Sequence, residues 1–126
     1  MLVLQQALDS GAVARVEVLH EDGSVWRSVG RPLTSEQEGR RLAALLRAPS
    51  DAVSAGITVG GVTYLAAEAG GRLLHGRHGG TGVVAVHRPP CIVVGSYGEG
   101  RPAAAAVRTV ASLADLFTTL GDPQAM

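Results

Sequence analysis

The sequence lacks several residue types from which functional sites are often built. It contains no lysine, so all 11 basic side chains of the lysine and arginine class are arginine. This absence excludes a phosphate-binding loop of the Gly-x-x-x-x-Gly-Lys-Ser/Thr type. Cys91 is the single cysteine, which excludes an intramolecular disulfide and argues against a cysteine-based metal site.

Long apolar segments and an excess of positive charge are missing as well. No stretch reaches the roughly 20 apolar residues of a transmembrane helix, and the first residues lack the positive start and apolar core of a secretory signal. We therefore expect a cytoplasmic protein without a membrane span. The formal net charge is +0, whereas nucleic-acid-binding domains normally carry a basic surplus. We expect no nucleic-acid partner.

Enzyme signatures are also absent from the sequence. There is no Gly-x-Ser-x-Gly motif around a nucleophile, and no pair of acidic residues lies within an apolar segment. His75 and His78 flank a predicted strand end with no acidic residue close in sequence, so they form no recognisable metal site. We expect no enzyme, cofactor or metal, and we expect three solvent-exposed histidines and one at the strand end.

The sequence does contain a regular pattern of short apolar segments. Its 126 residues, 46% of them hydrophobic, suffice for a single domain over residues 1–126. Periodicity predicts helices at residues 2–8, from Thr34 to Pro49, and at residues 103–120 with Gly121 as the cap. Alternation predicts strands at residues 13–20, 25–29, 57–59, 62–68, 72–76, 83–87 and 91–97.

Local signals refine this pattern. Asp22-Gly23 indicates a hairpin turn, and Thr34 with Gln37 three residues later fits a capping box. The segment 13–20 alternates as a half-buried strand does, whereas the apolar run 92–94 is typical of a strand covered on both faces. Hairpin-length turns join the later strands, so these strands must pair antiparallel.

Aromatic residues make up only 3% of the chain, so each of them is informative. They are Trp26, Tyr64, Tyr97 and Phe117. Core packing is the default interpretation for each ring. Trp26 combines a large ring with a polar N–H and follows the hairpin turn, which makes it the best candidate for an exposed anchor of a binding surface.

Six segments, in order along the chain, resemble the sequence motifs of the profilin family. Together they cover about residues 12–121. The segments are 22–26 (DGSVW), 34–38 (TSEQE), 56–64 (GITVGGVTY), 74–82 (LHGRHGGTG), 91–99 (CIVVGSYGE) and 113–117 (LADLF). The resemblance implies an α+β fold with a central antiparallel sheet of about six to seven strands. The N- and C-terminal helices would lie on one face of the sheet and smaller helices on the other.

Profilins bind monomeric actin, and the resemblance implies the same partner here. The residues at positions that match the actin-binding face of the family are Arg72, Arg77, His78, Arg88, Arg101 and Arg108. Arg77 and His78 replace paired lysines, and arginine can pair with acidic groups of actin in their place. Ala104 and Val107 replace a glycine and an asparagine of the family, which removes a polar contact and adds bulk.

Profilins also bind proline-rich peptides through stacked aromatic rings. The residues implied for this surface are Trp26, Leu4, Leu116 and Phe117. Because residues 2–4 are aliphatic and Leu116 replaces a tyrosine, we expect weak or absent polyproline binding. Phosphoinositides are a third class of family ligand, and the scattered arginines predict at most a weak site for them.

The sequence supports one leading function and two alternatives. The leading interpretation is a monomeric, cytoskeleton-associated, actin-monomer-binding protein of the profilin type that regulates actin assembly. The first alternative is a profilin-fold adaptor without actin binding. The second is a roadblock-type dimerising scaffold module, which also has a Leu-rich helix after an Asp-Gly hairpin but has fewer strands after that helix. Stable homodimerisation would favour the roadblock-type module.

Overall fold

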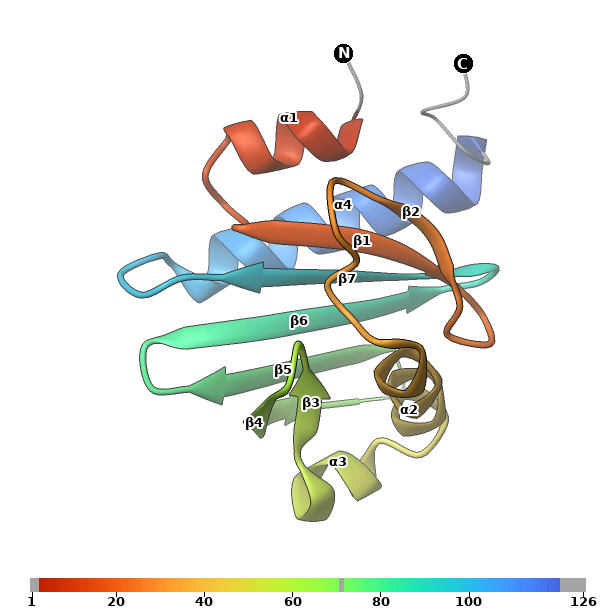
Figure 1. The fold of residues 1–126 in the computed structure, drawn as a ribbon, viewed down its shortest axis with the longest axis vertical. Helices are drawn as coiled ribbons and strands as arrows, with labels where there is room; N and C mark the ends of the chain where they lie inside the picture. The colour runs from red at the N-terminus through yellow and green to blue at the C-terminus, as the bar shows by residue number, and fades with distance from the viewer. Residues whose placement is uncertain (1–2, 71, 121–126) are drawn as a thin grey trace.

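A seven-stranded antiparallel sheet forms the centre of the computed structural model, which describes residues 3–70 and 72–120 (Figure 1). Across the sheet, the strands follow the order β2-β1-β7-β6-β5-β4-β3. They are β1 (Arg15–His20), β2 (Val25–Ser28), β3 (Ile57–Val59), β4 (Val62–Ala69), β5 (Leu73–His78), β6 (Thr81–Arg88) and β7 (Cys91–Tyr97). The helices are α1 (Val3–Asp9), α2 (Glu36–Arg47), α3 (Ser50–Ala55) and α4 (Ala103–Leu120). The predicted helix start at Leu2 and the predicted cap Gly121 lie outside the described residues.

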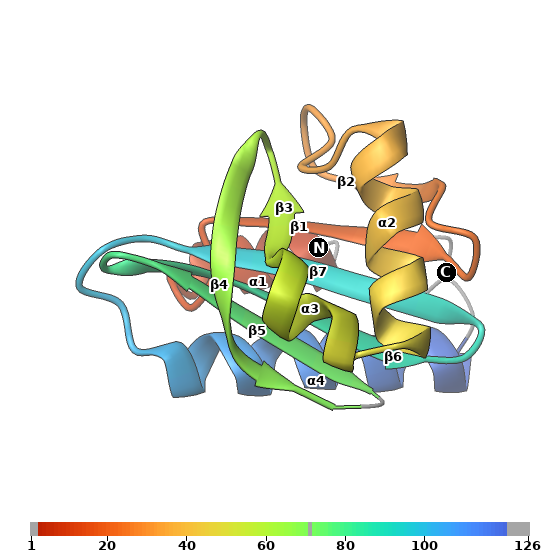
Figure 2. The ribbon, with the colours of Figure 1, turned by 90° about the horizontal axis from the view of Figure 1, so that it is seen from below.

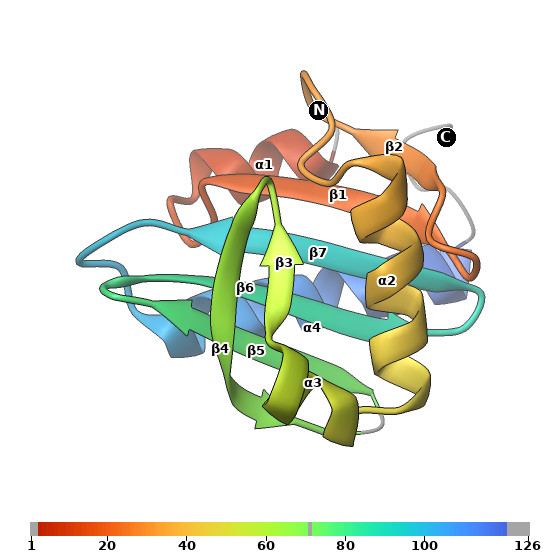
Figure 3. The same cartoon turned by 60° about the horizontal axis from the view of Figure 1, so that its bottom comes forward.

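Helices cover both faces of this sheet. α1 and α4 pack on one face, whereas α2 and α3 lie in front of the other (Figure 3). Successive residues of a strand enter different cores, so Val93 of β7 packs under α4 while Ile92 and Val94 pack under α2. The predicted α+β architecture is confirmed, as is the prediction that the last strand is covered on both faces.

The same layering covers both faces of β1. The four central residues of this strand are buried, and only its two end residues are exposed. The prediction of a half-buried strand is therefore wrong for this segment. Leu19 enters the core under α2, and the chain leading into α2 contacts Glu17, so the second face of β1 has no access to solvent.

Glu17 is a carboxylate with no exposed surface in the middle of β1. The backbone N–H of Leu33 donates to its Oε2 at 2.8 Å, and the backbone N–H of Thr34 donates to its Oε1 at 2.9 Å. The Thr34 hydroxyl also donates to Oε1. These three donors compensate the buried carboxylate and fix the segment that leads into α2.

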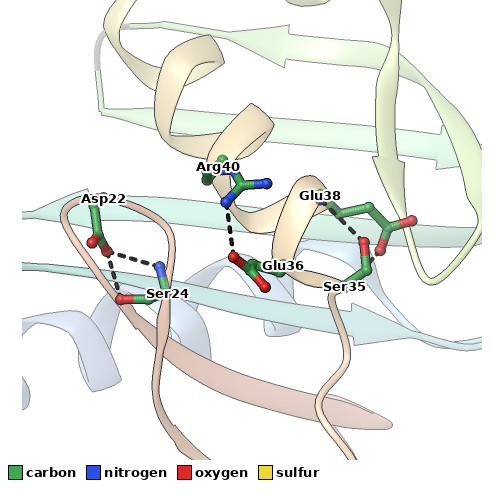
Figure 4. A network of polar contacts seen from close by, with 6 residues as sticks. All are labelled: Asp22, Ser24, Ser35, Glu36, Glu38 and Arg40. Carbon is green, nitrogen blue, oxygen red and sulfur yellow. Dashed lines mark hydrogen bonds and ion pairs between the residues drawn. The ribbon is translucent and has the colours of Figure 1, made fainter.

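α2 begins later than the sequence predicted. Its N-cap is Ser35, whose Oγ accepts a hydrogen bond from the Glu38 backbone N–H at 3.1 Å. Oε1 of Glu38 accepts in turn from the Ser35 backbone N–H at 3.0 Å, which completes a capping box (Figure 4). The predicted box of Thr34 and Gln37 is wrong, because the Thr34 hydroxyl is bound to Glu17 instead.

Glu38 also connects the start of α2 to the turn between β3 and β4. The backbone N–H of Gly60 donates to its Oε1 at 2.9 Å, and that of Gly61 donates to its Oε2 at 2.8 Å. Burial raises the pKa of Glu38, but the hydrogen bonds from Ser35, Gly61 and Gly60 outweigh it and hold the pKa below its ordinary value. One ionised side chain thus holds a helix start and a hairpin turn together.

The β1–β2 turn packs directly against α2 through two glycines. Asp22 shapes this turn, because its Oδ1 accepts from the Ser24 backbone N–H at 2.9 Å and from the Ser24 hydroxyl at 2.6 Å (Figure 4). A Cβ atom on Gly39 would collide with the Gly23 carbonyl oxygen, and a Cβ atom on Gly23 would collide with the backbone at Gly39. The close approach therefore requires glycine at both positions.

Two features of the middle of the chain were not predicted. Pro49, which was expected to end a helix, is the N-cap of the six-residue helix α3. β4 carries a bulge between Ala66 and Glu68, and β3 and the first part of β4 stand across the face that α2 also covers (Figure 2). A bulge bends a strand and increases its twist, which accounts for this change of direction.

We predict that Glu17→Gln destabilises the fold. The amide retains one acceptor oxygen, so one of the donors at Leu33 and Thr34 loses its partner in a buried site. The expected loss is about 1–3 kcal/mol of unfolding free energy, measured by chemical denaturation. Glu36→Gln is the matched control, because it removes the same charge from an exposed ion pair with Arg40 and should cost less than about 0.5 kcal/mol. Equal losses in the two variants would contradict the role of Glu17.

Candidate functional site

The residues predicted to contact actin lie at different places on the molecule. Arg77 and His78 end β5, beside the turn to β6. Arg72 and Arg88 lie at the opposite end of these two strands, where the backbone N–H of His87 donates to the Arg72 carbonyl oxygen at 2.9 Å. The four residues therefore occupy two ends of the sheet.

The remaining predicted residues belong to α4 and the segment before it. Arg108 lies on the exposed side of α4. Arg101 lies beside Gly11 in the connection between α1 and β1, where an added Cβ would be 3.2 Å from the arginine Nη1. Nε of Arg88 donates to Asp115 Oδ1 at 3.2 Å, near the other end of α4. The six residues do not form one continuous cationic patch.

Arg77 and His78, which the sequence resemblance matched to paired lysines, lie on opposite faces of the sheet. Side chains of successive strand residues alternate between faces. The His78 ring packs edge-on against Tyr64, a member of the core under α2, with ring centroids 6.2 Å apart. Arg77 shares the face of His75, which lies beside α4. Of this pair, Arg77 alone adds charge to the surface beside α4.

A shallow hollow opens on this face between β4, β5 and the first turns of α4; we call it the α4 hollow. It is lined by Glu68, His75, Ala103, Ala104, Val107 and Arg108. Ala103, Ala104 and Val107 make the α4 wall of the hollow aliphatic. Arg108 and Glu68 add one positive and one negative group. The hollow can receive a side chain of a protein partner.

His75 forms part of the floor of the α4 hollow and is buried, with 7% of its surface exposed. Its Nε2 lies 2.7 Å from the Tyr97 hydroxyl oxygen. Burial lowers the pKa of His75 below its ordinary value of 6.5. The sequence led us to expect three solvent-exposed histidines and one at a strand end, and it did not predict that His75 is buried against the Tyr97 hydroxyl. The predicted strand began at residue 83, so the sequence did not mark Gly82 as a glycine within a strand, where such a residue often permits a close approach.

The other histidines are more accessible. His20 and His78 are exposed, and His87 is partly buried and paired with Glu21. In the described ranges, no three His, Cys, Asp or Glu side chains group as metal ligands. No helix within residues 3–70 and 72–120 is long and apolar enough to cross a membrane.

The second predicted surface centres on Trp26 in β2, which is half-buried. Its ring stacks on His20 with centroids 5.3 Å apart, and it meets Phe117 edge-on at 5.4 Å. Leu4 and Phe117 have no exposed area, so they form the floor beneath this surface, whereas Leu116 is 37% exposed. Two of the four predicted residues can therefore touch a ligand directly.

A groove between α1 and α4 runs past Leu116. It is lined by Val3, Gln6, Ala7, Ser10, Arg108, Thr109, Ser112, Leu113 and Leu116. None of these described residues is aromatic. Proline-rich peptides are bound mainly by stacking on aromatic rings, so this groove offers a proline-rich peptide aliphatic contact and no ring to stack on.

Comparisons with known proteins agree with one another. The Profilin family model matches residues 1–121. Profilin-P of Physarum polycephalum is 32% identical over 117 residues, which cover 93% of each chain. The solved structure of Acanthamoeba castellanii profilin II has a TM-score of 0.87 at 26% identity, covering 94% of this chain and 95% of that one. Schizosaccharomyces pombe profilin has a TM-score of 0.86 at 28% identity, with the same two coverages.

The sequence motifs, the sheet order with its two helical layers and these matches all lead to one assignment. The family model spans all of the described residues, and the strand order and helix placement agree with solved profilins. This chain belongs to the profilin family.

Proposed function

We propose that this chain binds monomeric actin and thereby regulates actin assembly. The agreement of its fold with profilins over 94% of the chain is the main support. Profilins are non-enzymatic actin-binding proteins, and LokiProfilin2, which shares the fold at 13% identity with a TM-score of 0.78, was solved as a complex with rabbit actin. A role in protein binding rather than catalysis follows from this membership.

The surface beside α4 has the chemistry that such a partner needs. Arg77 and Arg108 are exposed, and neither forms an ion pair with another described residue. Arg108 lines the α4 hollow together with Ala104 and Val107, and Arg77 lies two residues from His75 on the same face of β5. An aliphatic wall that carries Arg108, with Arg77 on the same face of the sheet, suits a partner surface that carries carboxylates. We place the actin-binding face at the α4 hollow.

Binding of proline-rich ligands is proposed to be weak or absent. Mouse profilin IIa, which shares the fold at 12% identity with a TM-score of 0.74, was solved with a double repeat from an FH1 domain. In this chain Trp26 is partly covered by His20, and the groove between α1 and α4 has no aromatic lining among the described residues. A polyproline helix would find few rings on which to stack.

We predict saturable one-to-one binding to monomeric actin that Arg77→Glu or Arg108→Glu weakens by about tenfold or more, because each reversal places like charges against the partner. Calorimetry gives the affinity, and slower spontaneous filament assembly gives the functional effect. Arg47→Glu is the control, since Arg47 is exposed at the end of α2 on the opposite face. Its affinity should equal that of the wild type.

Two results would count against this function. Absence of binding at actin concentrations up to about 50 µM would mean that any affinity is too weak for a specific complex. The fold would then serve another partner. Equal effects of the Arg47, Arg77 and Arg108 reversals would show that actin responds to net charge and not to the face beside α4.

For proline-rich ligands, we predict that a ten-proline peptide leaves the fluorescence of Trp26 unchanged up to about 100 µM, a concentration far above the dissociation constant of a specific site. Leu116→Tyr places a ring in the groove at an exposed position and should produce measurable quenching in the same range. Quenching of the wild-type protein that saturates at low micromolar peptide would contradict the prediction.

A further inference from the structure

The floor of the α4 hollow is held by a polar contact across three strands. The Tyr97 side chain of β7 passes over β6 to reach His75 of β5, where its hydroxyl oxygen lies 2.7 Å from Nε2. It crosses β6 at Gly82, where a Cβ atom would collide with the ring and the hydroxyl. Glycine at this position is therefore what allows the two side chains to meet.

The same contact supports the wall of the hollow. Tyr97 belongs to the buried cluster against which Ala103 and Val107 of α4 pack. Both of these α4 residues also line the hollow. A change in the charge of His75 thus acts on the floor directly and on the α4 wall through Tyr97.

Charged and titratable groups face His75 from each neighbouring element. Glu68 of β4 is its partner in register, Arg77 lies two residues further along β5, Tyr97 approaches from β7, and Arg108 of α4 lines the same hollow. Burial is the largest influence and lowers the pKa of His75; Glu68 raises it and Arg77 lowers it. The imidazole is therefore neutral at neutral pH.

We propose that His75 is a positioning residue of the actin-binding face, which binds its partner with the imidazole neutral and loses affinity when acid protonates it. The proposal rests on the proposed function and adds a regulation to it. His75 keeps 7% of its surface exposed through the hollow. A partner that covers the hollow removes this remaining contact with solvent and makes the charged form still less favourable.

The sign of the effect follows from proton linkage. If the bound state holds a proton on His75 less well than the free state, binding releases a proton, and affinity falls as pH falls. The full affinity is present above the ordinary pKa of 6.5 and declines as pH drops through the lowered pKa of the free protein. His75 is protonated at a higher pH in the unfolded chain than in the folded chain. Acid therefore also reduces the free energy of unfolding.

The test compares the affinity for monomeric actin at about pH 7.5 and about pH 5.5, which bracket the titration of a histidine. Three proteins are used: the wild type, His75→Gln and His20→Gln. Glutamine keeps a group that can bond to the Tyr97 hydroxyl but does not titrate. His20 is exposed at the end of β1, so its variant makes the same substitution at a histidine that does not line the hollow. Titration of actin itself affects all three equally.

Between the higher and the lower pH, the affinities of the wild type and of His20→Gln should fall by about threefold or more beyond any fall seen for His75→Gln. In the wild-type protein, the titration of the His75 imidazole, followed by NMR, should move to lower pH when actin is added. This second measurement does not depend on the folding of any variant.

The outcomes separate this inference from the proposed function. Binding with the same pH dependence in the wild type and His75→Gln would overturn the inference and leave actin binding intact. A titration of His75 that moves to higher pH on binding would also overturn it. No binding of the wild type at either pH would overturn the proposed function, and the inference with it.

Discussion

The fold depends on a carboxylate that has no contact with water. Glu17 lies in the second strand from one edge of the sheet and binds the two backbone N–H groups that lead into α2. α2 then presents Gly39 to the β1–β2 turn and Glu38 to the β3–β4 turn. These contacts connect the hairpin at one edge of the sheet to the hairpin at the other edge, across the face that α2 and α3 cover. The opposite face is covered by α1 and α4.

The two faces of the sheet therefore differ: one is held by internal polar contacts, and the other carries the candidate binding surfaces. The face under α2 and α3 uses its polar groups internally, in the contacts of Glu17 and Glu38. The other face carries both candidate surfaces, the α4 hollow and the area around Trp26. Arg108 lines both the hollow and the groove between α1 and α4, so these two depressions share the outer side of one helix.

Signals that are local in sequence predicted most of the architecture. Alternation and the Asp22-Gly23 turn placed the strands, and the last strand and last helix have the predicted bounds. Contacts between distant segments were not accessible: Glu17 takes the Thr34 hydroxyl away from the predicted cap, and Tyr97 reaches His75 only because the sheet brings three strands together. Matching positions by resemblance listed Arg77 and His78 as a pair, but it carried no information about which face each side chain occupies.

β7 is the strand most fully enclosed by the rest of the molecule. Its two neighbours, β1 and β6, use both of its hydrogen-bonding edges, and residues 91–95 are buried beneath helices on both faces. An amide proton of β7 can exchange with solvent only when a neighbouring strand and a helical layer separate from it together. The slowest-exchanging backbone of the protein should therefore lie in the strand between its two candidate surfaces, and a partner that binds at the surface of α4 can dissociate without opening the strand beneath it.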